Sequence, residues 1–185
     1  MTSVFIVHGA EGSPQENWLP WLRKELDKLG CKIYIPKFPT PKDQNLEAWM
    51  QEFLKYGFHL EEDNIFVGHS LGVLFLLHLL EFREAKASFL VSGFDELPGN
   101  KYDKGMKSFV KKFDYEKIKK NCKKFYIYHS DTDKIVDISK AEKLAKNLDT
   151  KVILVKDAGH INASAGYTKF EVLLKDIKKE LKSKK

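Results

Sequence analysis

The stretch Asn64-Ile-Phe-Val-Gly-His-Ser-Leu-Gly-Val-Leu-Phe-Leu-Leu-His-Leu-Leu-Glu-Phe82 decides how the rest of the chain is interpreted. Its apolar start, Ile65 to Val67, is typical of a buried strand, and Leu71 to Phe82 is long enough for a helix. Between them lies Gly68-His69-Ser70-Leu71-Gly72, a Gly-x-Ser-x-Gly pattern in which a sharp strand-to-helix turn presents a serine hydroxyl. We therefore predict that Ser70 is a nucleophile, because the following helix directs free N–H groups toward a developing oxyanion.

Strand-like and helix-like patterns alternate along the whole chain. The predicted strands are 3–7, 31–35, 65–67, 87–92, 124–129 and 151–155. The predicted helices are 18–29, 46–54 (capped by Asn45), 71–82, 107–113, 115–121, 141–148 and 166–181. Most strands are continuous apolar runs, which are typical of a parallel sheet buried on both faces. We predict one domain over residues 1–185, a three-layer α/β/α sandwich with a six-stranded, mainly parallel sheet. Its ligand site should lie beyond the strand ends, between the first and third strands.

The charge distribution is asymmetric, which raises the hypothesis of a module that binds nucleic acid or another polyanion through the basic second half. Residues 1–85 carry 8 basic and 12 acidic side chains, whereas residues 86–185 carry 24 and 14. All basic residues except Arg23 and Arg83 are lysines, and arginine is the usual residue for bidentate recognition of phosphates and bases. We interpret the lysines as solvated helix faces.

The composition also indicates in which compartment we expect the protein. No run of eighteen apolar residues is present, so we expect no membrane span. No basic flank or cleavage site precedes the first strand, so we expect no signal peptide. Cys31 and Cys122 are far apart without metal-type spacing, which indicates free buried thiols in a cytoplasmic protein.

A serine nucleophile needs a neighbouring base, and six histidines are available. His160 stands in a glycine-containing loop, Asp157-Ala-Gly-His-Ile-Asn, just after the last strand, where it can reach over the serine. The other histidines fit a structural or pocket-lining role better: His8, His59, His69, His78 and His129. We predict that His160 is the base.

The base in turn needs a carboxylate that holds its tautomer. The loop His129-Ser-Asp-Thr-Asp-Lys-Ile-Val-Asp137 follows the preceding strand, so its acid can reach sideways to His160. Spacing alone does not separate Asp131 from Asp133. The order serine, aspartate, histidine is that of α/β-hydrolases.

Backbone N–H groups and aromatic side chains complete the predicted site. Leu71 follows the nucleophile and should supply one oxyanion-hole N–H; the loop after the first strand should supply the other, most simply Ala10, with Glu11 second. Three aromatic side chains near the strand ends are candidates for substrate contact: Trp18, Phe38 and Phe94.

Taken together, these residues resemble the α/β-hydrolase superfamily and, within it, the retinoblastoma-binding protein 9 family of small serine hydrolases. The resemblance covers nearly the whole chain and is densest in three segments: Glu116–Cys122, Ser130–Val136 and Asp157–His160. It implies a minimal hydrolase core with little or no lid, Ser70 as nucleophile and His160 as base. It also places the acid on the second aspartate of its loop, Asp133.

The chain departs from that family in three places. Asp137 stands where a proline usually follows the valine of the acid loop, and Phe113-Asp114-Tyr115 replaces a tryptophan-bearing stretch, which we expect to reshape the pocket wall. The Leu-x-Cys-x-Glu motif for retinoblastoma binding is not formed, because Leu29-Gly-Cys-Lys-Ile33 ends in isoleucine. No partner of that type is implied.

The sequence thus predicts a carboxylesterase-like serine hydrolase that cleaves small acyl esters through a Ser70-His160-Asp133 triad and an acyl-enzyme, without metal or cofactor. The expected partner is a small acyl substrate, and neither nucleic acid nor membrane. A catalytically weak or inactive binding protein of the same fold would share every motif, so only an activity measurement separates the two.

Overall fold

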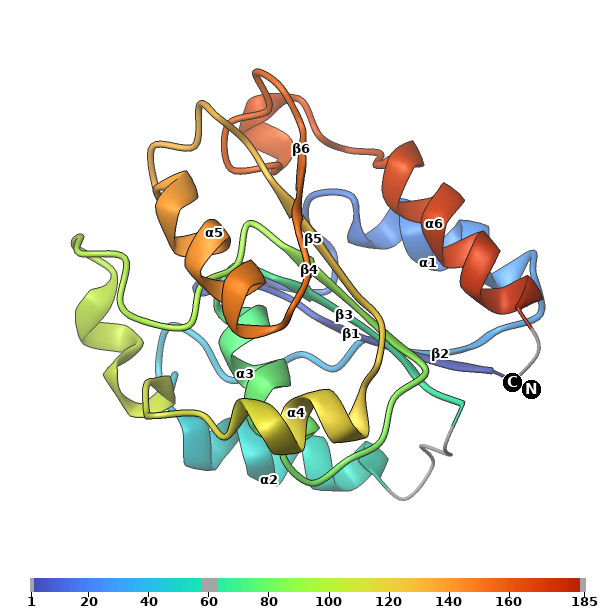
Figure 1. Ribbon diagram of the computed structural model, residues 1–185, viewed down its shortest axis with the longest axis horizontal. Helices are drawn as coiled ribbons and strands as arrows, with labels where there is room; N and C mark the ends of the chain where they lie inside the picture. Colours follow the sequence, from blue (N-terminus) through green and yellow to red (C-terminus); the bar gives the residue numbers. More distant parts are fainter. Residues whose placement is uncertain (1, 58–62, 184–185) are drawn as a thin grey trace.

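The chain folds into a six-stranded sheet between two layers of helices (Figure 1). The structure is a computed structural model that describes residues 2–57 and 63–183. The strands are β1 (Ser3–Val7), β2 (Lys32–Tyr34), β3 (Ile65–His69), β4 (Ala87–Val91), β5 (Phe125–His129) and β6 (Val152–Leu154). The α-helices are α1 (Leu19–Asp27), α2 (Leu46–Gly57), α3 (Leu71–Leu80), α4 (Tyr115–Asn121), α5 (Ile138–Asn147) and α6 (Glu171–Lys182). Three single-turn 3₁₀ helices are η1 (Asp103–Gly105), η2 (Lys107–Phe109) and η3 (Ala163–Ala165).

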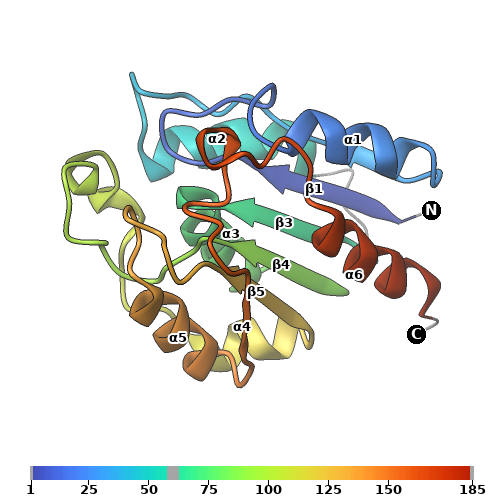
Figure 2. The ribbon, with the colours of Figure 1, turned by 90° about the horizontal axis from the view of Figure 1, so that it is seen from above.

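The strand order is β2-β1-β3-β4-β5-β6, and each neighbouring pair is parallel. Figure 2 shows β1, β3, β4 and β5 side by side. The predicted parallel sheet is confirmed. After β1 the chain adds β2 on one side and β3 on the other, so the order reverses between β1 and β3. Val7 at the end of β1 pairs with Gly68 of β3, which brings the loop after β1 beside Ser70. This is the place where open α/β sheets bind ligands.

The two helix layers bury separate apolar clusters against the sheet. Helices α1 and α6 lie side by side on one face, where Leu22 and Ile177 pack in one cluster (Figure 1). Helices α2 to α5 cover the other face, where Trp49 and Leu144 belong to the second cluster. All ten residues of α3 are buried, because this helix is enclosed between the sheet and neighbouring segments. The leucine-rich run that follows Ser70 therefore forms the centre of the core.

Several helix boundaries differ from the predicted ones for local reasons. Helix α5 starts at Ile138, three residues early, because the Asp137 carboxylate caps it by accepting the Ser139 N–H at 2.9 Å. Helix α6 starts at Glu171 and not at Gly166, whose φ of +87° is incompatible with a helix. The segment predicted as helical from Lys107 to Phe113 forms only η2, which Val110 ends in extended conformation.

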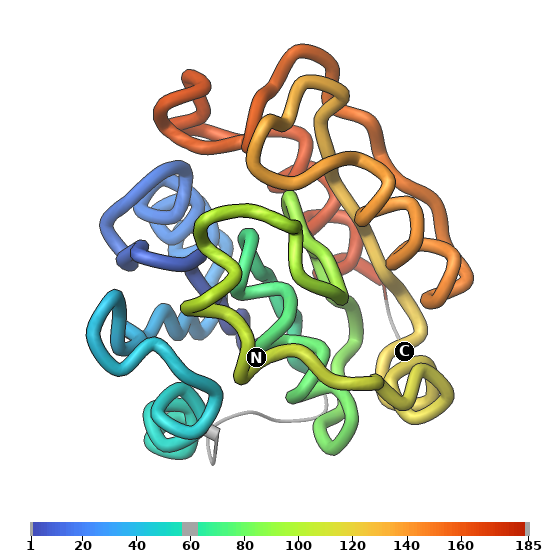
Figure 3. Tube along the Cα trace, turned by 90° about the vertical axis from the view of Figure 1, so that its left-hand side faces the viewer, coloured from blue at the N-terminus to red at the C-terminus, as the bar shows by residue number. Residues whose placement is uncertain are grey.

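The loops that follow the strands gather at the carboxyl ends of the strands, on the side of the molecule that faces the viewer in Figure 3. The long segment 93–113 crosses this side of the molecule beside the loops after β1, β5 and β6. Both cysteines are buried and unpaired, as predicted. In the described part of the chain, no helix has the length and apolar character needed to span a bilayer.

Candidate active site

Ser70 occupies a strained turn at the junction of β3 and α3. Its φ of +54° and ψ of −119° lie in a region that non-glycine residues rarely adopt. The Ser70 N–H donates to the Val91 carbonyl at 2.9 Å, which ties the turn to β4. The predicted sharp strand-to-helix turn at Ser70, called a nucleophile elbow, is therefore present in the backbone.

The glycines around Ser70 allow backbones to approach one another. A Cβ on Gly72 would lie 2.5 Å from the Val7 carbonyl oxygen, and one on Gly68 would lie 2.8 Å from a Leu76 methyl carbon. Because the contacts of Gly72 are with backbone, they cannot relax by side-chain rotation. The motif glycines thus set how closely α3 packs against β1 and β3.

His160 and Asp133 are hydrogen-bonded to each other. His160 Nδ1 lies 2.8 Å from Asp133 Oδ2, and the Asp133 side chain is completely buried. The other carboxylate oxygen, Oδ1, accepts the N–H groups of Ile135 (2.9 Å) and Val136 (3.0 Å). Burial alone would raise the pKa of Asp133, but the hydrogen bond and charge of His160, together with these N–H donors, hold it below its ordinary value. The ionised carboxylate therefore favours a proton on Nδ1 and leaves Nε2 as the acceptor.

Asp131, which spacing could not separate from Asp133, has a different partner. Its Oδ1 accepts the Asp157 N–H at 2.9 Å and so ties the loop after β5 to the loop after β6. Of these two aspartates, Asp133 is therefore the one that contacts His160.

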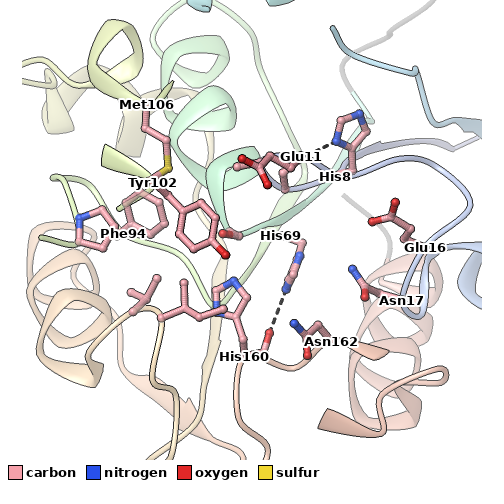
Figure 4. Close-up of a pocket in the computed structure, with 17 residues that line it drawn as sticks. His8, Glu11, Glu16, Asn17, His69, Phe94, Tyr102, Met106, His160 and Asn162 are labelled. Atoms are coloured by element: carbon pink, nitrogen blue, oxygen red, sulfur yellow. Dashed lines mark hydrogen bonds between the residues drawn. The ribbon is translucent and has the colours of Figure 1, made fainter. Parts of the chain in front are cut away.

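The main chain at His160 is fixed by hydrogen bonds from distant side chains. The His160 carbonyl accepts His69 Nε2–H at 3.0 Å (Figure 4). It also accepts the Ser92 hydroxyl at 3.1 Å. Trp18 Nε1–H donates to the next carbonyl, that of Ile161, at 3.0 Å. Burial, reinforced by the nearby His160, lowers the pKa of His69 to about 3, so His69 is a neutral donor.

Two backbone N–H groups near Ser70 are available to an oxyanion. Leu71 is the first residue of α3, where N–H groups lack partners within the helix. Within the described residues the Ala10 N–H has no hydrogen-bond partner, whereas the Glu11 N–H donates to Thr40 Oγ1 (2.8 Å) and Gln44 Oε1 (3.0 Å). Of the two donors considered in this loop, Ala10 therefore fits better than Glu11.

Ser70 and His160 face a common cavity of about 190 Å³ (Figure 4). Phe94, one of the three aromatic candidates for substrate contact, is fully buried but lines this cavity. The sequence did not single out several other lining residues. Five of them come from segments without a motif: Glu16, Asn17, Pro98, Tyr102 and Met106. Ile135, Val136 and Asn162 lie in the quoted acid and base loops, but the motifs do not show which of their side chains face the cavity. Only the topology brings these segments together.

Two aromatic residues expected at the cavity lie in the core instead. Trp18 is fully buried against His69 and Phe170, and its indole N–H is used by the His160 loop. Phe38 is also fully buried and stacks on Trp49 at a centroid distance of 4.6 Å. Both expectations of substrate contact were therefore wrong, although Trp18 holds the loop of His160 through its hydrogen bond to the Ile161 carbonyl.

The remaining described histidines have structural partners. His8 Nε2 accepts the Phe38 N–H at 3.0 Å, so its proton is on Nδ1, which donates to the Gly9 carbonyl. His78 and His129 each have Nε2 within 2.9 Å of a backbone carbonyl, those of Phe109 and Val136. Burial lowers the pKa of all three. His59 lies outside the described residues.

The stretch Phe113-Asp114-Tyr115, expected to reshape the pocket wall, lies away from the cavity. Phe113 packs edge-on against His78, and Tyr115 donates its hydroxyl to Asp95 at 2.5 Å. The wall is built from Tyr102 and Met106 in its place. This expectation was wrong because the segment leads into α4, in the helix layer formed by α2 to α5.

The strand order, the elbow and the surrounding cavity define the α/β-hydrolase fold class. The chain belongs to the serine hydrolase family, whose sequence model matches residues 4–179. It is 31% identical over 179 residues to YdeN of Bacillus subtilis (strain 168), with 92% of this chain and 91% of YdeN covered. It is 27% identical over 183 residues to the serine hydrolase RBBP9 of Rattus norvegicus, with 97% and 96% covered.

Solved structures agree with this fold. The crystal structure of the B. subtilis ydeN gene product superposes with a TM-score of 0.91 at 29% identity, covering 99% of this chain and 100% of that one. The alpha/beta hydrolase domain-containing protein 10 from mouse gives a TM-score of 0.69 at 15% identity, with 97% and 90% covered, which is a likeness of fold.

Proposed function

We propose that this protein hydrolyses small carboxylic esters through a covalent acyl-enzyme on Ser70. The observation that carries the proposal is the 2.8 Å hydrogen bond between Asp133 and His160, next to a cavity that Ser70 also lines. A buried, ionised carboxylate on Nδ1 is the arrangement that prepares Nε2 to take a proton from a serine hydroxyl.

In the proposed reaction, His160 Nε2 removes the Ser70 proton as Ser70 Oγ attacks the ester carbonyl. The N–H groups of Ala10 and Leu71 stabilise the resulting oxyanion, a contribution of about 3 kcal/mol for each donor in comparable sites. His160 then protonates the leaving alcohol, and water, activated by the same imidazole, releases the acid from Ser70. Asp133 stays ionised throughout and stabilises the imidazolium.

The size of the cavity supports a small acyl substrate. Its volume of about 190 Å³ is below the ~300–1,000 Å³ of pockets for drug-sized ligands. Short acyl chains should therefore be hydrolysed faster than long ones.

The test is labelling with a fluorophosphonate probe, which reacts only with activated serines, followed by assays with p-nitrophenyl esters of increasing chain length. We expect wild type to be labelled and Ser70→Ala and His160→Ala to lose labelling and about 10⁴-fold or more of their ester hydrolysis. The control Ser139→Ala changes an exposed serine of α5 and should behave as wild type. A folded wild type that is neither labelled nor active would exclude the proposal and favour a binding protein.

A further inference from the structure

The cavity has two chemically different sides with the reacting groups between them. Phe94, Tyr102 and Met106 form an apolar side, whereas Glu16, Asn17 and Asn162 form a polar one (Figure 4). His69 and His160 lie between the two sides in the same view. We call the groups Glu16, Asn17 and Asn162 the polar arm.

The polar arm carries uncompensated negative charge. The carboxylate of Glu16, and that of Glu11 at the same cavity, have neither an ion pair nor a hydrogen bond to any described residue. Many other acidic side chains in this lysine-rich chain are paired, as Glu96 is with Lys140 at 2.7 Å. Burial lowers the pKa of His8, and this is opposed by its hydrogen bond to the Gly9 carbonyl and by the negative charge of Glu16.

The two asparagines fix the arm in place and leave donors facing the cavity. Asn17 Oδ1 accepts the Ala163 N–H at 2.9 Å, and Asn162 Oδ1 accepts the Ala165 N–H at 3.1 Å. Since both amide oxygens are used, the amide NH₂ groups remain for a ligand. The arm is therefore held by backbone contacts. Its amide NH₂ groups can donate to substrate oxygens, whereas the carboxylate of Glu16 is the group of the arm that can attract a cation.

From this arrangement we infer that the preferred substrate carries a cationic group on one side of its scissile carbonyl and an apolar group on the other, with Glu16 selecting the cation. The inference rests on the proposed ester hydrolysis and adds the charge of the substrate to it. An exposed carboxylate gains little from an ion pair in water, so the preference should be about fivefold and should fall as salt is added.

The experiment compares esters that differ only in one charged atom. Butyrylcholine and 3,3-dimethylbutyl butyrate place the cation or its neutral isostere in the leaving group. Ethyl 4-(trimethylammonio)butyrate and ethyl 5,5-dimethylhexanoate do so in the acyl group. We expect wild type to prefer the cationic member of one pair in kcat/KM by about fivefold at low salt. Glu16→Gln should reduce that ratio to near one, while Glu142→Gln, which changes an exposed acid of α5 away from the cavity, should keep it.

Binding of the same esters to Ser70→Ala, measured by calorimetry, tests the cationic preference separately from the proposed ester hydrolysis. If wild type hydrolyses none of the esters, the proposed function fails, while a cationic preference in binding that Glu16→Gln removes would still support the inference. Equal affinities and equal kcat/KM values within both pairs, or a preference that Glu16→Gln leaves intact, would overturn it.

Discussion

The turn that carries Ser70 and the loop that carries His160 reach the same cavity by different means. The turn is signalled by neighbours in sequence, since Gly68 and Gly72 flank Ser70, and their lack of side chains lets α3 approach β3 and the end of β1. The His160 loop is held by side chains far away in sequence: His69 and Ser92 donate to the His160 carbonyl across 91 and 68 positions, and Trp18 reaches Ile161 across 143. The position of Ser70, the proposed nucleophile, is thus encoded locally, whereas the position of His160, the proposed base, depends on the completed fold.

The largest effect on kcat should come from changing Asp133, which contacts His160. Asp133→Asn removes the carboxylate that orients His160 and should lower kcat by about 10³- to 10⁴-fold, because the amide no longer selects the required tautomer. Asp131→Asn is the matched control in the same loop: its carboxylate contacts the Asp157 N–H instead, so kcat should fall less than about tenfold. Steady-state kinetics on a short-chain ester measures both, and equal losses would remove the distinction between the two aspartates.

On the elbow side, Gly72→Ala should destabilise the whole domain. The added Cβ would meet the Val7 and His8 carbonyl oxygens at 2.5 and 2.8 Å, so we expect a loss of about 3 kcal/mol in the free energy of unfolding. Gly30→Ala is a control with a φ of +72° but open space around it, and should cost only about 1 kcal/mol. Urea denaturation distinguishes them, and a Gly72→Ala protein as stable as Gly30→Ala would contradict the close packing of α3.

His69 belongs to both regions, since it precedes Ser70 and donates to the His160 carbonyl. His69→Ala should lower kcat by about tenfold with little change in KM, because one of two hydrogen bonds to that carbonyl is lost. His69→Gln, which can retain a donor, should recover part of the loss. An equal change in kcat and KM for both variants would indicate a general structural defect and not a positioning role.

A further prediction concerns the dependence of stability on pH. His8, His69, His78 and His129 have pKa values lowered by burial, so below about pH 6.5 the unfolded chain takes up protons that the folded state does not. The free energy of unfolding should therefore decrease as pH falls, by at most about 1.4 kcal/mol per pH unit for each histidine. For His69 this window extends down to its folded pKa of about 3.

Urea titrations between pH 7 and pH 5 measure this slope. His69→Gln should have a shallower slope than wild type, by the contribution of one histidine. Identical slopes would show that His69 is protonated in the folded state.

The comparison also explains which features the sequence could predict. Each predicted strand is present, because apolar runs bounded by turn residues are local signals. Ser70 and its turn were found for the same reason. Trp18 was misassigned because its partners, Phe170 and Ile161, lie more than 140 residues away. Tyr102 and Met106 could not be found, since the irregular segment that carries them has no periodicity that would show which side chains face the cavity.

The two ends of the sheet have a consequence for the behaviour of the protein at high concentration. Its outermost strands, β2 and β6, are only three residues long. Long edges with free N–H and C=O groups recruit strands from other molecules and start fibrils. Here an incoming chain finds few backbone groups to pair with, and the charged side chain of Lys32 is exposed on one of the two edges. The domain is thereby protected against edge-to-edge aggregation by the brevity of its border strands.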